Sequence, residues 1–340
     1  MKRSRFTQNI EAQLNFCSSP NKLNSESFSK ISSSSSGDSC IFCSYSGILW
    51  CFDVVQLHFS QIGKHEDALS DVAFCQGSNS SANLVISCSY DGTVYFWDSR
   101  AVQFTPVQSL QVPPPANCVA WKDNFVACGF QDSGGLFWWD LRNLGNPLNL
   151  EESHAEAVTQ VLFTEDGKLI SSAEDGYICS LYTQRLPDED EALDYVINTG
   201  SAIYRFGLYD SMKPYLWSIT RTQEIYCFDL DTLDTTLKSQ RENVSHTGNK
   251  VRSLGNIDYF VSCFYDSLAE KLFIGGGMDN GQLLLLTQYE DANTLVPLVS
   301  LDKGHQDVVR DSIWNNANQT MTTVGEDGKV CIWKINLERS

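Results

Sequence analysis

Residues 83–98, NLVISCSYDGTVYFWD, contain two apolar runs separated by an Asp-Gly pair and end in an aromatic residue followed by Asp. Short runs rich in β-branched and aromatic residues are typical of strands, and Asp-Gly between two of them is a hairpin signal. Helical 3.6-residue patterning is nearly absent from the chain. The stretch therefore predicts two antiparallel strands joined by a tight turn.

The same phrase recurs seven times along the 340 residues. Successive ends lie 45, 42, 43, 46, 58 and 47 residues apart, close to the roughly 40–45 residues of a four-stranded propeller blade. The spacing predicts an all-β chain in which residues 1–340 form a single seven-bladed propeller domain, with a loop insertion in the longest interval. The phrases end at Phe52-Asp53, Trp97-Asp98, Trp139-Asp140, Tyr182, Phe228-Asp229, Leu286 and Trp333.

The last phrase, GHQDVVRDSIW followed by GEDGKVCIW (304–333), resembles a complete repeat of the WD-repeat family, and the second phrase matches nearly as well. In that family a His, a Ser or Thr, the turn Asp and a Trp form a hydrogen-bonded set that braces each blade. Repeat four keeps three of these positions but has Leu181 in place of the Trp. The resemblance implies bracing sets at His65, Ser87, Asp91 and Trp97, at His154, Ser171 and Asp175, and at His305, Thr323, Asp327 and Trp333.

The other four repeats depart further from the family pattern. Ser46, Thr222 and Asn280 stand in or near the position of the turn Asp, and repeat three has an extra residue around 132–135. These repeats are identified mainly by their spacing.

Closure of the ring is a separate expectation. The family usually takes the outermost strand of the last blade from the N-terminus, and only KINLERS follows Trp333. The resemblance therefore implies a closing strand within residues 1–16, with RFTQNIEAQLNF (5–16) as the candidate. Such a strand would remove exposed sheet edges.

Charge and hydropathy indicate which classes of partner and which cellular compartment to expect. The chain has 42 acidic and 24 basic residues, a net charge of −18, which repels nucleic-acid phosphate and anionic lipid. No apolar run approaches the roughly 18–20 residues of a membrane span, and none follows the basic start as in a signal peptide. We expect a soluble intracellular protein, cytoplasmic and/or nuclear, monomeric by itself, that binds neither nucleic acid nor membrane.

The twelve cysteines are scattered through strand-like runs, where they fit as buried free thiols. The one Cys-x-x-Cys pair, Cys40 and Cys43, would point to opposite faces of a strand and has no second pair nearby. We therefore expect no metal and no other cofactor.

The preferred function is that of a non-enzymatic scaffold that binds other proteins. The chain lacks a Gly-x-Ser-x-Gly elbow, a phosphate-binding loop and a His-Glu-x-x-His motif, so no catalytic residue is predicted and a propeller enzyme is the least favoured alternative. A ribosome-assembly or chromatin-associated scaffold remains a further alternative. The uncommitted histidines, His58 and His246, lie far apart in the sequence.

Two adjacent repeats end in Trp-Asp-x-Arg, with Arg100 and Arg142 as their last residues. This pair resembles the signature by which some family members dock on the adaptor of a cullin-RING ubiquitin ligase as substrate receptors. An Arg just past the third strand can project from the rim and bind a carboxylate through two hydrogen bonds. Alternatively, each Arg bonds the Asp of its own blade.

An acidic run, PDEDEAL, supplies Asp188, Glu189, Asp190 and Glu191 in a short loop between repeats. A basic tail of another protein could bind there, or the run could be a solvated loop that aids solubility. Together with the phrase VTQVLF at 158–163, the run also resembles one subgroup of the WD-repeat family.

Overall fold

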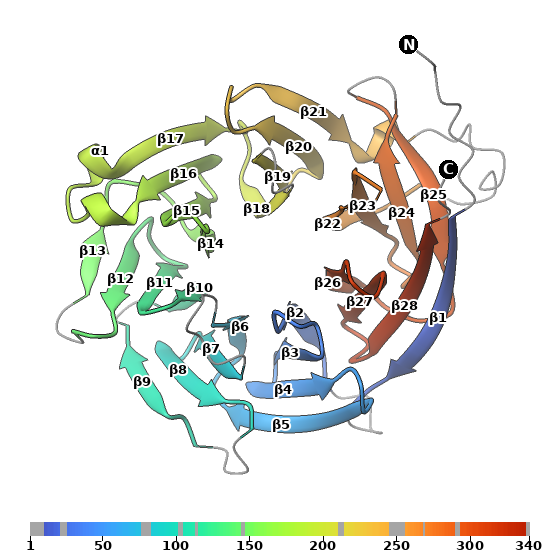
Figure 1. The fold of residues 1–340 in the computed structure, drawn as a ribbon, viewed down its shortest axis with the longest axis horizontal. Coiled ribbons are helices and arrows are strands. Elements are labelled where there is room, and N and C mark those ends of the chain that lie inside the picture. The colour runs from blue at the N-terminus through green and yellow to red at the C-terminus, as the bar shows by residue number, and fades with distance from the viewer. Residues whose placement is uncertain are drawn as a thin grey trace.

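The computed structural model arranges the chain as a ring of seven antiparallel sheets, each with four strands (Figure 1). It describes residues 10–20, 26–75, 83–100, 105–112, 115–143, 147–209, 214–244, 256–267, 269–289 and 293–337. Each sheet is one blade, which runs from an inner strand near the axis to an outer strand at the rim. The expected fold class, an all-β seven-bladed propeller, is confirmed.

The strands of the blades follow one another along the chain. Blade one contains β2 (Phe28–Ser33), β3 (Ser39–Ser44), β4 (Ile48–Asp53) and β5 (His58–Lys64), and blade two contains β6 (Leu69–Phe74), β7 (Leu84–Ser89), β8 (Thr93–Asp98) and β9 (Gln108–Gln111). Blade three contains β10 (Ala116–Lys122), β11 (Phe125–Phe130), β12 (Leu136–Asp140) and β13 (Leu148–Leu150), and blade four contains β14 (Val158–Phe163), β15 (Lys168–Ala173), β16 (Tyr177–Tyr182) and β17 (Leu193–Asn198). Blade five contains β18 (Ile203–Tyr209), β19 (Tyr215–Thr220), β20 (Glu224–Asp229) and β21 (Thr235–Gln240), and blade six contains β22 (Tyr259–Asp266), β23 (Lys271–Gly277), β24 (Leu283–Gln288) and β25 (Leu295–Leu301).

Blade seven joins the two ends of the chain. Its strands are β26 (Val309–Asn315), β27 (Thr320–Gly325), β28 (Val330–Leu337) and, outermost, β1 (Ile10–Ser18). β1 pairs antiparallel to β28 from Ile10 opposite Leu337 to Ser18 opposite Val330, and Figure 1 shows the first and last strands side by side. The closing N-terminal strand is thus confirmed, although it extends past Phe16 and residues 1–9 lie outside the described part of the chain.

Helical structure is sparse. The described residues contain α1 (Glu189–Ala192) and two 3₁₀ turns, η1 (Thr183–Arg185) and η2 (Arg241–Asn243). None of the helices described is long and apolar enough to cross a membrane. The insertion expected in the longest interval falls between β21 and β22, where 245–255 lie outside the described residues.

Antiparallel strands give the ring two distinct faces. One face carries the turns between the second and third strands of each blade and the loops between blades; we call it the loop face. The other, the opposite face, carries the turns between first and second and between third and fourth strands. On the loop face of blade two, Gly92 N–H donates to the Ser89 carbonyl and Gly92 has a φ of +78°, a conformation that favours glycine.

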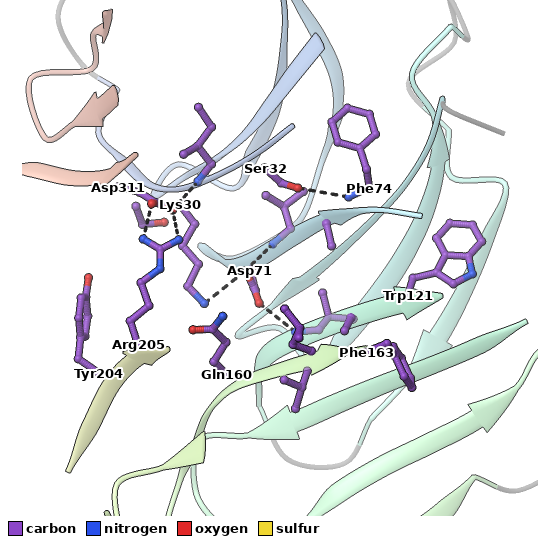
Figure 2. A pocket seen from close by; sticks show the side chains of 18 residues that line it. Lys30, Ser32, Asp71, Phe74, Trp121, Gln160, Phe163, Tyr204, Arg205 and Asp311 are labelled. Carbon is purple, nitrogen blue, oxygen red and sulfur yellow. Dashed lines mark hydrogen bonds and ion pairs between the residues drawn. The ribbon is translucent and has the colours of Figure 1, made fainter. Parts of the chain in front are cut away.

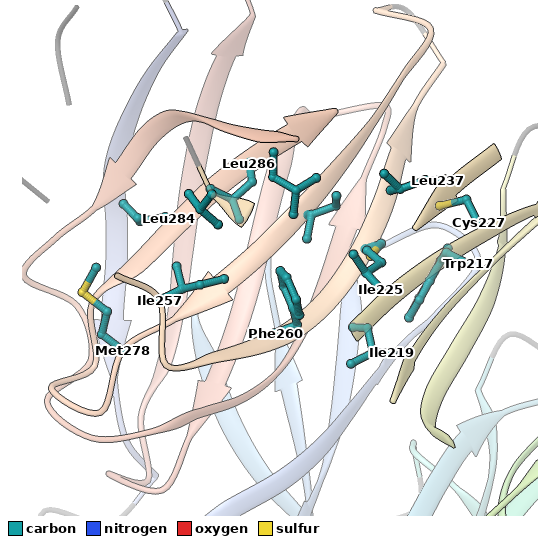
Figure 3. Packing of buried hydrophobic residues seen from close by; sticks show 14 residues of the cluster. Trp217, Ile219, Ile225, Cys227, Leu237, Ile257, Phe260, Met278, Leu284 and Leu286 are labelled. Carbon is teal, nitrogen blue, oxygen red and sulfur yellow. The ribbon is translucent and has the colours of Figure 1, made fainter. Parts of the chain in front are cut away.

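Packing between neighbouring blades fills the ring. The largest hydrophobic cluster joins blades five and six, where Trp217, Ile219 and Ile225 pack against Phe260 and Leu284 (Figure 3). Trp97 of blade two is similarly buried against the outer strand of blade one, and its ring lies over Gly63. A Cβ at Gly63 would lie 2.2 Å from that ring, so the glycine is required by close approach.

Candidate functional site

A chain of hydrogen bonds in blade two joins the third strand to the turn. Trp97 Nε1 donates to Ser87 Oγ at 2.8 Å, and Ser87 Oγ lies 2.7 Å from His65 Nε2. His65 Nδ1 lies 2.9 Å from Thr93 Oγ1, and the Thr93 hydroxyl donates to the Asp91 carboxylate. The structure therefore brings together the four residues expected in this blade and adds Thr93, which the motif did not indicate.

The direction of these bonds fixes one state of His65. Because the Thr93 hydroxyl donates to Asp91, its oxygen accepts from His65 Nδ1–H, and His65 Nε2 then accepts from the Ser87 hydroxyl. Burial lowers the pKa of His65 to about 4, against the opposing effect of Asp91. His65 is accordingly neutral at pH 7.

Blade seven brings together the corresponding four residues without an intervening hydroxyl. His305 Nδ1 lies 3.0 Å from Asp327 Oδ1, and His305 Nε2 lies 2.8 Å from Thr323 Oγ1. Trp333 Nε1 donates to Thr323 Oγ1 at 2.9 Å. Lys329 stands where blade two has Thr93, so no hydroxyl lies between the histidine and the aspartate here. In blade two His65 Nδ1 also lies 3.4 Å from Asp91 Oδ2.

In blade four the histidine makes the same two contacts as in blade seven, but no Trp donates to the hydroxyl. His154 Nε2 lies 2.8 Å from Ser171 Oγ, and His154 Nδ1 lies 3.3 Å from Asp175 Oδ2. Leu181 is buried at the Trp position.

The turn aspartates also hold the loops between blades. Asp91 accepts from the backbone N–H of Glu66 at 3.1 Å, Asp175 from that of Ala155 at 2.9 Å, and Asp327 from that of Gln306 at 2.9 Å. Each set therefore fixes one loop of the loop face to the blade beneath it.

In blade one a buried carboxylate, and not a histidine, forms hydrogen bonds to the second strand and the turn. The Glu26 carboxylate accepts from the Ser44 hydroxyl and, at 2.8 Å, from the hydroxyl of Ser46, which stands in the turn-Asp position. Glu26 precedes the first strand of the blade, as the histidines do in blades two, four and seven. Comparison among the repeats missed it because Glu26 stands two residues before the first strand of its blade, whereas the histidines stand four residues before theirs.

A polar channel runs along the axis of the ring, where a cavity of about 180 Å³ is lined by the inner strands (Figure 2). Every inner strand has a register shift close to its start, and bulges of this kind re-aim side chains. In blades two and seven the residues directly after the register shift are Asp71 and Asp311. Figure 2 shows both carboxylates beside cationic side chains, Lys30 and Arg205.

The channel carboxylates serve as ties between blades. Asp71 Oδ2 accepts from the backbone N–H of Val119 at 3.0 Å, and Lys30 lies 3.3 Å from its other oxygen. Asp311 Oδ2 accepts from the backbone N–H of Ile31 at 3.0 Å. Each carboxylate thus satisfies a backbone donor of the next blade, as buried polar groups require.

Three partly exposed tyrosines lie on the loop face, and one of them, Tyr204, also lines the channel cavity, whose opening on this face we call the mouth. Tyr45 and Tyr90 follow the second strands of blades one and two, and Tyr204 is the second residue of β18; they are 50%, 37% and 37% exposed. Burial raises the pKa of Tyr45, and Arg310, Tyr204 and Tyr90 are among the groups close enough to affect it. The three side chains come from blades one, two and five.

Carboxylates predominate on the loop face as a whole. The described turns and interblade loops of the loop face carry 17 acidic and four basic residues. Of these four basic residues, Arg221 is paired with Glu174, Arg241 with Glu242 and Lys329 with Asp327. Arg310, which lies in β26, is paired with Glu326. A second hollow of about 360 Å³ adjoins the mouth, lined in part by Tyr204, Tyr259, Arg310 and Asp279.

Arg100 and Arg142 occupy equivalent places on the opposite face. Their side chains are 62% and 63% exposed. Each guanidinium bonds the Asp two residues earlier through two nitrogens, with Nη2 2.6 Å from Asp98 and Asp140, respectively. Both arginines therefore bond their own blade while remaining accessible on neighbouring blades.

The acidic run is more structured than a solvated loop. Asp188 caps α1 by accepting from the Glu191 N–H at 3.0 Å, and Glu189 accepts from the N–H of Glu151 and the hydroxyl of Ser153. Asp190 and Glu191 are exposed. The run thus fastens the outer edge of blade four to blade three and leaves only part of its charge free.

The family model for the WD domain, G-beta repeat, matches residues 58–98, 145–179 and 296–334. WD repeat-containing protein GTS1 of Arabidopsis thaliana is 30% identical over 294 residues, which cover 82% of this chain and 73% of that protein. The chain belongs to the WD-repeat family. The three matched segments are those that contain the histidine-based bracing sets of blades two, four and seven.

The narrower WD-repeat resemblance is to WD repeat-containing protein 89 and is also confirmed. The homolog of that protein in Dictyostelium discoideum is 29% identical over 282 residues, which cover 80% of this chain and 73% of the relative. WD-repeat proteins are generally protein-interaction scaffolds.

In the described part of this WD-repeat chain, no group of three or more His, Cys, Asp or Glu side chains is arranged to hold a metal ion. All twelve cysteines are free thiols, and eleven are buried. His246 lies outside the described residues, and His58 is exposed in β5.

Proposed function

We propose that this chain is a non-enzymatic scaffold that holds a Lys/Arg-rich segment of a partner protein at the mouth of the channel on the loop face. The observation that carries the proposal is the loop face around the mouth, where Tyr45, Tyr90 and Tyr204 are partly exposed among turns and loops that are mostly acidic.

The chemistry of the mouth suits a cationic segment. A Lys or Arg side chain placed over a tyrosine ring gains a cation–π interaction, and the surrounding carboxylates attract the same charge. Tyrosines that are partly buried lose less conformational entropy on binding than fully exposed side chains, so they are effective anchors. The net charge of −18 adds a long-range attraction for basic partners.

The channel groups support a scaffold over an enzyme. Lys30 is paired with Asp71, Arg205 with Asp311, and both carboxylates also accept backbone N–H bonds. Groups engaged in this way hold the blades together and are poorly placed to exchange protons with a substrate.

Titration with labelled peptides tests the proposal. We expect a fluorescent Lys/Arg-rich peptide to bind the full chain, and a peptide with Glu at the same positions to show no binding. Added salt should weaken binding, because part of the attraction is between exposed charges. Tyr45→Ala and Tyr204→Ala should each weaken it about tenfold, the effect of losing one anchor.

Tyr289→Ala is the matched control, because Tyr289 is 54% exposed and lies on the opposite face, after β24. It should leave the affinity for the basic peptide unchanged. Equal effects of Tyr289→Ala and Tyr45→Ala, or equal binding of the Glu peptide, would refute the assignment of the mouth.

Docking of a cullin-RING ligase adaptor on the opposite face is a second candidate function. It is supported by the matching geometry and exposure of Arg100 and Arg142 on adjacent blades. Because each guanidinium is accessible, it could exchange its intrablade carboxylate for one on a partner.

Co-purification of the adaptor with wild type and with the double variant Arg100→Ala, Arg142→Ala tests this candidate. We expect adaptor with wild type and none with the double variant, while binding of the basic peptide at the loop face is unchanged. Absence of adaptor from the wild-type sample would end the idea.

A further inference from the structure

Cys17 and Cys331 face each other where the two ends of the chain meet. They are directly opposed residues of the antiparallel pair β1 and β28, and their Sγ atoms lie 2.9 Å apart. Opposed residues in such a pair have Cα atoms about 4.5–5.5 Å apart, within the roughly 4.4–6.8 Å that a disulfide requires. We propose that Cys17 and Cys331 are a reversible oxidation site whose disulfide fastens the closing strand to the last strand.

Cys17 is the accessible member of this pair. It is partly exposed, whereas the other eleven cysteines are buried. Its hydrogen bond with Cys331 lowers the pKa of Cys17, and nearby Lys329 acts in the same direction against burial and Asp327. A thiol with a lowered pKa is more often the reactive thiolate.

Cys331 is suited to form the disulfide with an oxidised Cys17. It is fully buried. Its hydrogen bond with Cys17 has the larger effect and its burial the smaller, and both raise the pKa of Cys331. Its sulfur is shielded from bulk oxidant but adjacent to the sulfur of Cys17. Cys331 therefore acts as the resolving thiol for a modified Cys17.

With hydrogen peroxide as the oxidant, the chemistry has two steps. The Cys17 thiolate attacks one peroxide oxygen, the O–O bond breaks, and the products are Cys17 sulfenic acid and hydroxide. The Cys331 sulfur then attacks the Cys17 sulfur; the S–S bond forms as the S–O bond breaks, and the Cys331 proton leaves with the departing hydroxyl as water. Overall, two thiols and one peroxide give one disulfide and two water molecules.

The bond would act on the one blade that is assembled from both ends of the chain. It would link residues 314 positions apart in sequence. A cross-link over so long a loop restricts the unfolded chain strongly and so favours the closed ring. In the folded state it would hold β1 against β28 without changing their register.

Peptide mapping under non-reducing conditions is the direct test. The reduced full-length protein is treated with hydrogen peroxide, remaining thiols are alkylated, and the digest is analysed by mass spectrometry. We expect a peptide pair linked through Cys17 and Cys331, lost on addition of dithiothreitol. The oxidised protein should melt roughly 5 °C higher than the reduced protein.

Two variants separate the roles of the thiols. Cys331→Ser should leave a Cys17 sulfenic acid that dimedone traps, and Cys17→Ser should abolish the linked peptide and the rise in melting temperature. Cys51→Ala, at a buried thiol far from β1 in the sequence, should behave as wild type. The proposal is overturned if wild-type Cys17 oxidises without the linked peptide, or if the linked protein melts no higher than the reduced form.

Discussion

Arg205 of blade five forms an ion pair with Asp311 of blade seven, so the contact passes over blade six, which lies between them in the ring. Arg205 Nη2 lies 2.8 Å from Asp311 Oδ2, and the same oxygen accepts the Ile31 N–H of blade one. One fully buried carboxylate therefore connects three blades across and around the axis.

Breaking this pair from one side should destabilise the ring. Arg205→Met leaves the Asp311 carboxylate buried without its counter-ion, and removal of one partner from a buried pair costs about 3–5 kcal/mol. We expect the urea midpoint of Arg205→Met to fall accordingly. Arg100→Met, which removes an exposed pair, should leave the midpoint unchanged, and equal shifts for both variants would contradict the assigned role of Arg205.

The neutral state of His65 predicts a pH dependence of stability. In the unfolded chain a histidine binds a proton below about pH 6.5, whereas folded His65 does so only below about pH 4. The unfolded state therefore binds more protons in this window and is favoured as the pH falls. His65 should contribute a loss of about 2 kcal/mol in unfolding free energy between pH 7 and 5, measured as the difference in pH slope between wild type and His65→Gln. Identical slopes would show that His65 has the same pKa in the folded and unfolded states, which would contradict the lowered value.

Gly63→Ala should destabilise the packing between blades one and two. The added Cβ would meet the Trp97 ring at 2.2 Å, and overpacking of a core typically costs about 1–3 kcal/mol. Chemical denaturation measures the cost. At Gly135 the nearest atom to an added Cβ lies at 3.4 Å, so Gly135→Ala should be tolerated; a neutral Gly63→Ala would mean that Trp97 can move aside.

Deletion of residues 1–16 should lower the melting temperature sharply. The deletion removes most of β1 and leaves β28 as an exposed edge beside Trp333 and Ile335, which are otherwise buried. Differential scanning calorimetry measures the shift, and Glu11→Ala, at an exposed position of the same strand, should have little effect. An unchanged melting temperature after the deletion would show that the ring closes without this strand.

The fold could be predicted because its signal is local and repeated. Residues 83–98 contain both strands and the turn of one hairpin, and the same period recurs along the chain. The bounds of the closing strand could not be read in the same way, because pairing with β28 sets its register and a shift falls between Leu14 and Phe16.

The bracing sets were predictable where all four residues keep their family positions, as in blades two and seven. The participation of Thr93 was not predictable, because it depends on the hydroxyl lying between His65 and Asp91 in the folded chain. The tyrosines of the loop face lie far apart in sequence, and the closure of the ring, not the local sequence, sets where Tyr204 of blade five lies relative to the other two. One signal was present: Ser44-Tyr45 and Ser89-Tyr90 are the same dipeptide one repeat apart.

During synthesis β1 is made long before β28, the strand with which it pairs. Cys17 and Cys331 are separated by 314 residues, so at about 5–20 residues per second the first strand leaves the ribosome roughly 15–60 s before its partner. During that interval the first strand has no neighbour, and blades one to six can form only an open arc. Until β28 is made, the unpaired backbone groups of β1 are open to pairing with other strands.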